Sequence, residues 1–350
     1  MLATEPSAVA HPKPVAPPAE AQTAWHHIIA PAEPFLHEVA SRLREQISAF
    51  ESDIATYAEY ALTNQGKQLR PALVALSGGA TGKINDSHVL VAVIIEMVHL
   101  ATLVHDDVMD EANVRRGRPT LAATWGNEIS VLLGDCLFAH ALKLAASFPT
   151  TEICRSVAAA TNTVCSGEIL QTQRRRNFEL SRAEYFKVLQ MKTGELFALS
   201  CDLGAFLSGA GAVQRSALRQ YGLAIGTAYQ VYDDCLDLFG SEAAAGKSLG
   251  TDLAKGKLTL PLLISLERAS VPERARIESM VREWEPHWFS GLLGMLREHR
   301  ALEDSQSVVH QYLQAAREKL AVLPDTQNRA GLAGLADYLA RQTDALGLAD

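Results

Sequence analysis

The spacing of apolar residues is the feature of this chain that most restricts its fold. From about residue 31 onward, apolar side chains recur at intervals of three and four positions, whereas alternating β-branched stretches are scarce. That interval places apolar side chains along one face of a helix. Prolines such as Pro149, Pro261 and Pro286 divide the pattern into helices of ordinary length. The sequence therefore predicts an all-α body, and its hydrophobic fraction of 48% is typical of a globular protein.

The N-terminal segment differs from this body. Residues 1–30 are rich in alanine and proline and carry no aromatic residue before Trp25, a composition that buries too little apolar surface to order itself. It contains Glu5 and Glu20 and no arginine, which argues against an organellar transit peptide. We expect a loose tail over residues 1–30 and one domain over residues 31–350.

Charge and cysteine content limit the partners and the compartment. The net charge of −8 disfavours nucleic acid, so the expected partners are small molecules. Five cysteines occur without a Cys-x-x-Cys pair, as expected for a protein of the reducing cytoplasm. The longest apolar runs, such as residues 90–95, fall short of the roughly 20 residues that span a membrane. A transient contact with a membrane surface stays open.

Two aspartate clusters of the same type follow apolar helical runs at residues 89–104 and 223–232. The clusters are Asp106-Asp107-x-x-Asp110 and Asp233-Asp234-x-x-Asp237. Residues four apart share a helix face, and like charges at that spacing destabilise a helix that lacks a counter-ion. Hard oxygen ligands in small number suit Mg²⁺, which keeps waters and bridges to phosphates. One such cluster taken alone is equally well explained as a solvated acidic helix end.

Basic residues near these clusters favour binding of a phosphorylated ligand. Arg115, Arg116 and Arg118 follow the first cluster closely, and their mutual repulsion calls for an anion. Further cations stand elsewhere in the sequence, namely Lys67, Arg70, Lys192, Lys247 and Lys257.

Together these motifs resemble the trans-type polyprenyl diphosphate synthases. The resemblance extends over residues 31–341 and rests on both aspartate clusters and on a set of further motifs, namely Lys67-x-x-Arg70-Pro71, His99, Arg115-Arg116-Gly117, Lys192-Thr193, Gln230 and Gly256-Lys257-x-Thr259-Leu260-Pro261. It implies a single-domain helical bundle of the isoprenoid synthase type around a central catalytic cavity. It also implies a homodimer.

The resemblance implies two separate diphosphate sites. Asp106, Asp107 and Asp110 with Asp233, Asp234 and Asp237 would hold three Mg²⁺ ions on an allylic diphosphate. The same diphosphate would contact Arg115, Lys192 and Lys257, and Lys247 would be a further substrate-binding residue. A second substrate, isopentenyl diphosphate, would bind without metal to Lys67, Arg70, His99 and Arg116. Thr193 and Gln230 would steady the allylic cation that forms when the diphosphate leaves.

The helix before the first cluster bears on product length. Thr102, Ala101, Val98 and Ile95 precede Asp106 and should line a channel leading away from the metals. No phenylalanine, tyrosine or tryptophan occurs within residues 87–124, whereas short-chain members of the family tend to block the channel there. The resemblance therefore implies a long all-trans product, hexaprenyl to decaprenyl, of the kind used for quinone side chains.

Three other functions remain to be weighed. A geranylgeranyl or farnesyl diphosphate synthase differs only in product length. A class I terpene cyclase would need no site for a second diphosphate. The expected second site, formed by Lys67, Arg70, His99 and Arg116, therefore argues against a cyclase. A non-catalytic synthase subunit would be expected to lose one aspartate cluster, and both are intact.

Overall fold

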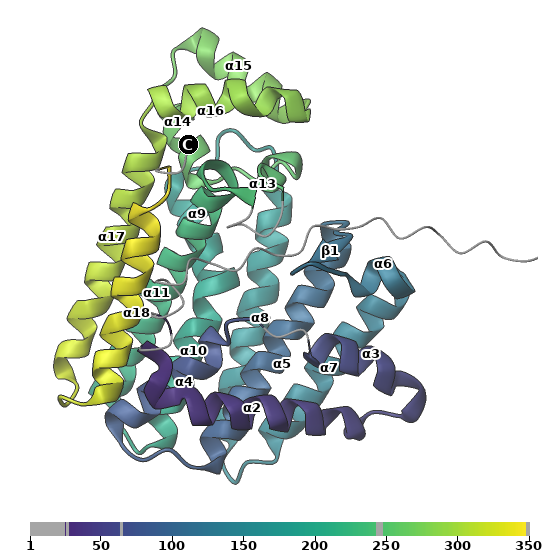
Figure 1. Ribbon diagram of the computed structural model, residues 1–350, viewed down its shortest axis with the longest axis vertical. Helices are drawn as coiled ribbons and strands as arrows, with labels where there is room; N and C mark the ends of the chain where they lie inside the picture. The colour runs from purple at the N-terminus through teal and green to yellow at the C-terminus, as the bar shows by residue number, and fades with distance from the viewer. Residues whose placement is uncertain (1–24, 26–27, 64–65, 243–247, 348–350) are drawn as a thin grey trace, which may run out of the picture.

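The expected all-α architecture is confirmed by the computed structural model (Figure 1). The structure describes residue 25 and residues 28–63, 66–242 and 248–347. Long helices lie side by side and form the body of the bundle. Its first half contains the 3₁₀ helices η1 (Ala30–Ala32) and η2 (Gln46–Ala49), and the α-helices α2 (Glu33–Glu45), α3 (Ser52–Thr63), α4 (Leu69–Thr81), α5 (Asp86–Met109), α6 (Leu121–Trp125), α7 (Asn127–Ala146) and α8 (Thr151–Gln173).

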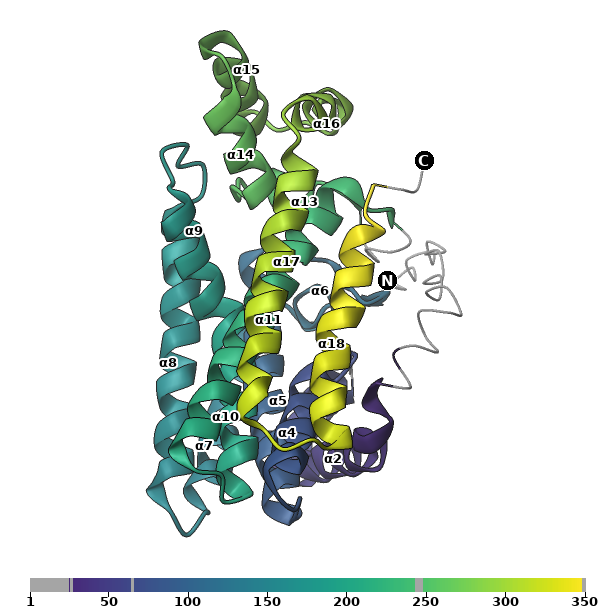
Figure 2. The same ribbon diagram turned by 90° about the vertical axis from the view of Figure 1, so that its left-hand side faces the viewer.

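The second half continues the bundle and adds a group of shorter helices at its upper end in Figure 1. Helices α17 and α18 lie side by side on the face that is turned toward the viewer in Figure 2. The elements are α9 (Arg182–Leu189), η3 (Gln190–Gly194), α10 (Glu195–Leu207), α11 (Ala212–Phe239), α13 (Thr251–Ala254), α14 (Leu260–Arg268), α15 (Val271–Arg282), η4 (Pro286–Trp288), α16 (Phe289–Glu298), α17 (Ala301–Lys319), η5 (Leu320–Val322) and α18 (Gln327–Asp344).

Part of the segment expected to be a loose tail contacts the body of the protein. Ile29 is 6% exposed, and the ring of Trp25 lies 5.6 Å from that of Tyr338 on α18. These residues therefore pack against the body. The remainder of the expected tail, residues 1–24, 26 and 27, lies outside the described residues.

Helix α5 is a central element of the core. Its N-terminus is fixed by Asn85, whose side chain accepts a hydrogen bond from the amide of Ser87, while Nδ1 of His88 accepts one from the amide of Asn85. Helices α2, α4, α7 and α10 pack around it. Both α5 and α7 are long and apolar enough to cross a membrane, but 72% of the apolar window of α5 is buried inside the protein. For α7 that share is 33%, so much of its apolar surface is uncovered.

Helices α10 and α11 approach each other closely because a glycine, which has no side chain, lies at their contact. A Cβ atom at Gly222 of α11 would lie 2.4 Å from the carbonyl oxygen of Phe197 on α10. Another close contact lies beneath η3, where a Cβ atom at Gly226 would come within 2.9 Å of Cα of Gly194. These contacts fix η3 relative to α11, which carries the second aspartate cluster.

The element η3 is a π-helical turn that joins α9 to α10. Ser181 and Glu184 form a capping box at the start of α9, so the helix that enters the turn begins at a defined residue. A π-turn inserts one residue into a helix and is frequent at functional sites. Here it contains Lys192 and Thr193.

A short hairpin follows α5. Strand β1 (Val114–Arg115) pairs antiparallel with β2 (Arg118–Pro119). The connecting residues Arg116 and Gly117 have φ of 52° and 72°. Positive φ at both central residues is typical of the tight turn that joins two-residue hairpins. After this turn Arg115 pairs with Asp107, and the guanidinium of Arg116 lies against Gly66.

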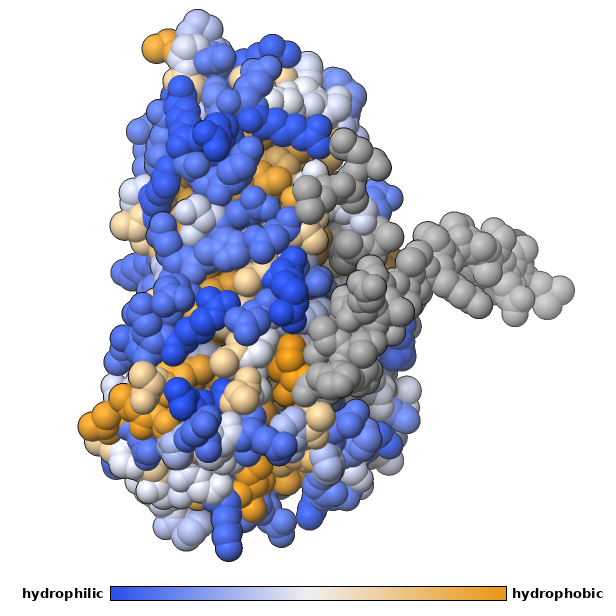
Figure 3. Space-filling view, turned by 60° about the vertical axis from the view of Figure 1, so that its left-hand side comes forward, coloured by the Kyte–Doolittle hydropathy of each residue, from blue (hydrophilic) through white to orange (hydrophobic). Residues whose placement is uncertain are grey.

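The surface agrees with a protein whose long helices turn polar faces outward. In Figure 3 hydrophilic residues cover much of the upper part of the visible face, and apolar residues gather in patches lower down. Large apolar residues that are exposed include Leu132 of α7 and Ile169 of α8, each close to 60% exposed.

Candidate active site

The two aspartate clusters lie at the ends of two core helices, as the sequence predicts. Asp106 and Asp107 belong to the last turn of α5, Asp110 is its C-terminal cap, and Asp233, Asp234 and Asp237 lie in the final turns of α11. Lys257 joins the clusters, because its Nζ lies 3.3 Å from Asp110 and 3.6 Å from Asp252, whose amide donates to Asp237. The helix ends therefore face one region at the upper end of the bundle.

Arg115 and Asp107 form an ion pair in which Nε lies 2.7 Å from Oδ1. Burial raises the pKa of Asp107, and Arg115 opposes that rise. The hairpin turn brings Arg115 back to the helix that it follows. The structure thus places Arg115 beside the first cluster.

Asp110 is surrounded by cations. Burial by itself would raise its pKa, but Lys257, Lys255 and Lys192 lower it to about 2. The carboxylate is therefore ionised at neutral pH. Among these cations Lys255 was not expected from the sequence, and neither was Arg175, which also contacts Asp110.

Lys192 faces the first cluster from the π-turn η3. Its Nζ lies 3.6 Å from Oδ2 of Asp106, donates to Oε1 of Gln171 at 3.0 Å and forms an ion pair with Glu168. Gln171 and Glu168 belong to α8. They hold the lysine beside the first cluster. The sequence did not identify either of them as a site residue.

Asp234 is the centre of a chain of hydrogen bonds behind the second cluster. The hydroxyl of Tyr185 on α9 donates to Oδ2 at 2.6 Å, and the side-chain amide of Gln230 donates to Oδ1 at 2.9 Å. Thr193 donates in turn to Oε1 of Gln230 at 2.8 Å. Burial raises the pKa of Asp234, and these two donors oppose that rise. The expected partners Thr193 and Gln230 are therefore adjacent, and Tyr185 is an addition.

Asp237 and Asp233 have different surroundings. Asp237 is fully buried and accepts hydrogen bonds from the hydroxyl of Thr251 at 2.7 Å and from the amide of Asp252 at 3.0 Å. It thereby fixes α13 on the end of α11. Asp233 is close enough to Lys67 to oppose the fall that burial causes in the pKa of that lysine. It connects the second cluster with the basic residues at the start of α4.

The four residues expected to bind a diphosphate without metal fall into one neighbourhood. A Cβ atom at Gly66 would lie 2.5 Å from Nη2 of Arg116, so the hairpin arginine lies against the segment that carries Lys67. Burial lowers the pKa of Arg70, and Glu96 opposes that effect. His99, one helical turn from Glu96, has its pKa lowered well below the ordinary value by burial, and by Arg70 and Arg116 in addition.

Arg70 is held more by packing than by hydrogen bonds. Its guanidinium carbon lies 4.9 Å above the ring centre of Phe197, and its Nε is buried with no hydrogen-bond partner among the described residues. An arginine stacked on an aromatic ring keeps its donors available for an anion. Glu96 is 3% exposed and supplies the nearby negative charge.

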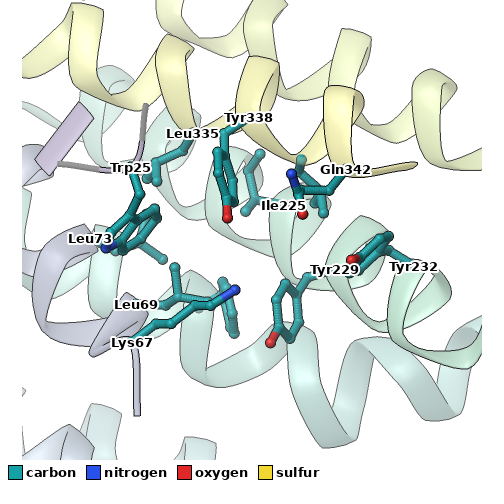
Figure 4. Close-up of a pocket in the computed structure, with 12 residues that line it drawn as sticks. Trp25, Lys67, Leu69, Leu73, Ile225, Tyr229, Tyr232, Leu335, Tyr338 and Gln342 are labelled. Atoms are coloured by element: carbon teal, nitrogen blue, oxygen red, sulfur yellow. The ribbon is translucent and has the colours of Figure 1, made fainter. Parts of the chain in front are cut away.

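A pocket opens beside this basic group (Figure 4). Lys67 extends over it, with Nζ 5.9 Å from the ring centre of Tyr338. Tyr229 of α11 and Tyr338 of α18 point into it from two sides. The pocket thus lies beside the expected metal-free site and does not include the aspartates.

The residues expected to line a product channel lie on α5, on the N-terminal side of the first cluster. Ile95, Val98 and Ala101 are buried in the core. Thr102 is partly buried, and its hydroxyl donates to the carbonyl oxygen of His99 at 2.6 Å. Their role in product length stays a prediction. Lys247 lies outside the described residues.

Comparison with known proteins decides the family. The polyprenyl synthetase family model matches residues 51–287. The chain belongs to the polyprenyl synthetase family. The resemblance inferred from the motifs is thereby confirmed.

Two curated relatives illustrate the range of the family. The octaprenyl diphosphate synthase of Haemophilus influenzae is 32% identical over 306 residues, which cover 87% of this chain and 93% of the relative. Component 2 of the heptaprenyl diphosphate synthase of Bacillus subtilis is 35% identical over 305 residues, which cover 85% and 86%.

Solved structures agree with these relatives. A decaprenyl diphosphate synthase from Rhodobacter capsulatus superposes with a TM-score of 0.86 at 31% identity, and the match covers 91% of this chain and 99% of that one. A polyprenyl synthase from Caulobacter crescentus, complexed with calcium and isoprenyl diphosphate, gives 0.86 at 33% identity, with 90% and 97% covered. The long-chain reading is supported over the geranylgeranyl or farnesyl alternative.

Proposed function

We propose that the chain condenses isopentenyl diphosphate with an allylic diphosphate and makes a long all-trans polyprenyl diphosphate for quinone side chains. The observation that carries the proposal is the presence of two cationic regions with different surroundings. Arg115, Lys192 and Lys257 lie beside the aspartate clusters, whereas Arg70 and Arg116 lie beside Glu96 and His99. Two regions of this kind suit two diphosphates, one with metal and one without.

The donor set fits Mg²⁺. Ammonium and guanidinium groups lie against the carboxylates of Asp106, Asp107 and Asp110, so positive charge already stands where a cation would bind. Within the described ranges, no group of three metal-ligating side chains is gathered around one point. We propose that the six aspartates of the two clusters hold the metal together, namely Asp106, Asp107, Asp110, Asp233, Asp234 and Asp237. Bound Mg²⁺ would neutralise charge on the departing diphosphate. A set of three ions stays the expectation from resemblance.

The side chains of the site have separate tasks in the proposed reaction. Lys192 and Lys257 bind oxygens of the allylic diphosphate and stabilise it as it leaves. Thr193 and Gln230, fixed by their mutual hydrogen bond of 2.8 Å, present oxygen dipoles to the allylic cation. Lys67, Arg70, His99 and Arg116 hold the second diphosphate so that its double bond attacks this cation. The departing diphosphate accepts the proton that is then lost.

A second copy of the chain is the proposed partner of α7. Leu132 and Val131 are 60% and 41% exposed, and covering them would bury apolar surface that the monomer leaves in water. The competing partner is a different subunit, as the name of the Bacillus subtilis relative suggests.

All five cysteines are free, which agrees with the proposed cytoplasmic location.

The proposal is tested by incubating the purified chain with labelled isopentenyl diphosphate, Mg²⁺ and each allylic primer in turn. Product length is read by chromatography, and oligomeric state by light scattering on the same sample. We expect elongation by a dimer of this chain alone. Elongation that appears only with a second kind of subunit would support the heteromeric alternative, and no elongation with any primer would contradict the enzyme assignment.

The same assay tests the metal site. Asp106→Ala and Asp233→Ala should each abolish turnover while circular dichroism stays unchanged. Full activity in either variant would mean that the cluster is only a solvated helix end.

A further inference from the structure

Asp110 contacts more cations than one carboxylate can neutralise. Nη2 of Arg175 lies 3.0 Å from Oδ1, and Nζ of Lys255 and of Lys257 lie 3.0 Å and 3.3 Å from Oδ2. Lys257 also faces Asp252 at 3.6 Å. In the part of the chain that the structure describes, neither Arg175 nor Lys255 pairs with another carboxylate. Two positive charges are thus concentrated beside Asp110 without carboxylates of their own.

The backbone brings these two residues together from distant parts of the chain. Arg175 follows α8, and Lys255 follows α13. The amide of the neighbouring Arg176 donates to the carbonyl oxygen of Gly256 at 2.8 Å. Gly256 has φ of 67°, and a Cβ atom there would lie 2.6 Å from Cγ of Arg176. The two segments are therefore joined directly, and the positions of Arg175 and Lys255 are a consequence of that contact.

The guanidinium of Arg175 has donor capacity to spare. Its Nε is buried with no hydrogen-bond partner among the described residues, although burying a donor without a partner costs free energy. Neighbouring Arg174 is anchored differently, by an ion pair with Glu184 at 3.1 Å. Of the two arginines, only Arg175 contacts the aspartate cluster.

We propose that Arg175 and Lys255 are additional binding residues for the allylic diphosphate, and that they exchange partners when the ligand arrives. Without ligand they occupy the oxygens of Asp110. When Asp110 takes metal, they move onto oxygens of the diphosphate. The inference rests on the proposed role of Asp110 as a Mg²⁺ ligand.

This exchange has two consequences of opposite sign. Before the diphosphate arrives, the two cations compete with Mg²⁺ for Asp110 and weaken the binding of metal alone. Once the diphosphate is present, they stabilise it by charge-assisted hydrogen bonds. Metal and diphosphate therefore bind more tightly together than either binds alone, which is a coupling between the two ligands.

The test uses calorimetric titration of the full chain with Mg²⁺ alone, and then with inorganic pyrophosphate. The Mg²⁺-dependent part of pyrophosphate binding is the difference between titrations in Mg²⁺ and in chelator. Arg175→Gln and Lys255→Gln should each bind pyrophosphate in Mg²⁺ about tenfold more weakly, the loss expected for one charge-assisted hydrogen bond. Each should bind Mg²⁺ alone more tightly than the unaltered chain.

Two further variants control the experiment. Arg182→Gln removes an arginine that pairs with Glu267 and does not contact Asp110, so neither titration should change. Arg175→Lys keeps the charge without the planar fork and should recover most of the pyrophosphate affinity. Circular dichroism and the midpoint of thermal unfolding show whether each variant is folded.

The outcomes separate this inference from the proposed function. If the unaltered chain shows no Mg²⁺-dependent binding of pyrophosphate, the proposed metal site is wrong, and the exchange with it. If the unaltered chain binds but both glutamine variants match it within about twofold, the residues do not contact the diphosphate. If the variants bind Mg²⁺ alone and pyrophosphate equally less well, Arg175 and Lys255 only support the fold, which also overturns the exchange.

Discussion

Tyr185 donates a hydrogen bond of 2.6 Å to Oδ2 of Asp234, a residue 49 positions away on another helix. The tyrosine is 5% exposed and Asp234 is equally buried, so the bond is shielded from water. The other oxygen of the carboxylate accepts a hydrogen bond from the side-chain amide of Gln230. Tyr185 therefore helps to orient Gln230 through Asp234, although it does not itself face the aspartate cluster on α5.

Tyr185→Phe should reveal the strength of this support. The substitution removes a donor from a buried carboxylate, and we expect the free energy of unfolding to fall by about 2 kcal/mol. Turnover should fall as well, because Gln230 loses its fixed orientation. Chemical unfolding and steady-state kinetics measure the two effects. Tyr57→Phe is the matched control, since Tyr57 packs on Trp125 far from Asp234. Equal effects of the two substitutions would show that the bond to Asp234 has no special importance.

Glu96 is expected to neutralise the repulsion between two nearby arginines. It lies buried, and Arg70 and Arg116 both lower its pKa against the rise caused by burial. Glu96→Gln should reduce the free energy of unfolding by about 3 kcal/mol, as for other buried charges that lose a partner. Isopentenyl diphosphate should restore more stability to this variant than to the unaltered chain, because its charges replace the missing carboxylate.

Thermal unfolding with and without isopentenyl diphosphate checks this expectation. Glu38→Gln removes a carboxylate from an exposed pair with Arg42 and should change stability by less than about 0.5 kcal/mol. A Glu96→Gln variant as stable as this control, with no added response to ligand, would show that Arg70 and Arg116 need no counter-charge.

His99 should act as a neutral hydrogen-bonding group. Its pKa lies well below the ordinary value because of burial and the three nearby arginines. His99→Gln should therefore keep most of the affinity for isopentenyl diphosphate, whereas His99→Ala should raise its KM about fivefold through loss of one neutral hydrogen bond. The KM of the allylic substrate should not change in either variant. A large defect in His99→Gln would instead indicate that the imidazole is charged when ligand is bound.

The same pKa shift predicts a dependence of stability on pH. The folded protein binds a proton at His99 less readily than the unfolded chain does, so the contribution of His99 to stability is present above about pH 6.5 and declines as the pH falls below it. His99→Gln lacks this group. Its free energy of unfolding should fall less between pH 7 and pH 5 than that of the unaltered chain, as measured in denaturant titrations. Parallel pH profiles would contradict the prediction.

The fold could be predicted from the sequence, whereas the contacts that hold the candidate site residues could not. Helical periodicity and the two aspartate clusters were sufficient for the fold and for the helix ends that carry Asp106 and Asp233. The π-turn at Gln190–Gly194 could not be foreseen, because over five residues its apolar spacing does not differ from that of an α-helix. The partners of Asp110 and Asp234 were missed since Arg175 and Tyr185 come from distant segments, and only tertiary packing brings them there.

We expect product length to depend on the face of α5 that leads away from Asp106. Thr102 lies four residues before Asp106, which is one helical turn of about 5.4 Å, and it is only partly buried. Thr102→Phe should place a ring close to the metal-binding end of the expected channel and so shorten the product. Leu103→Phe is the control on the same helix. Leu103 lines a pocket with Tyr60 and Leu121 on the side of α3 and α6, and Asp107, Arg115 and Arg116 line this pocket too, so the two variants are compared at equal turnover.

Chromatography of the products at equal turnover distinguishes the two variants. We expect shorter chains from Thr102→Phe and an unchanged distribution from Leu103→Phe, because only the first ring would meet a growing chain. Shortening by both variants to the same extent would point to a general distortion of α5. Unchanged products from Thr102→Phe would remove this residue from the channel and leave the limit on chain length to another helix.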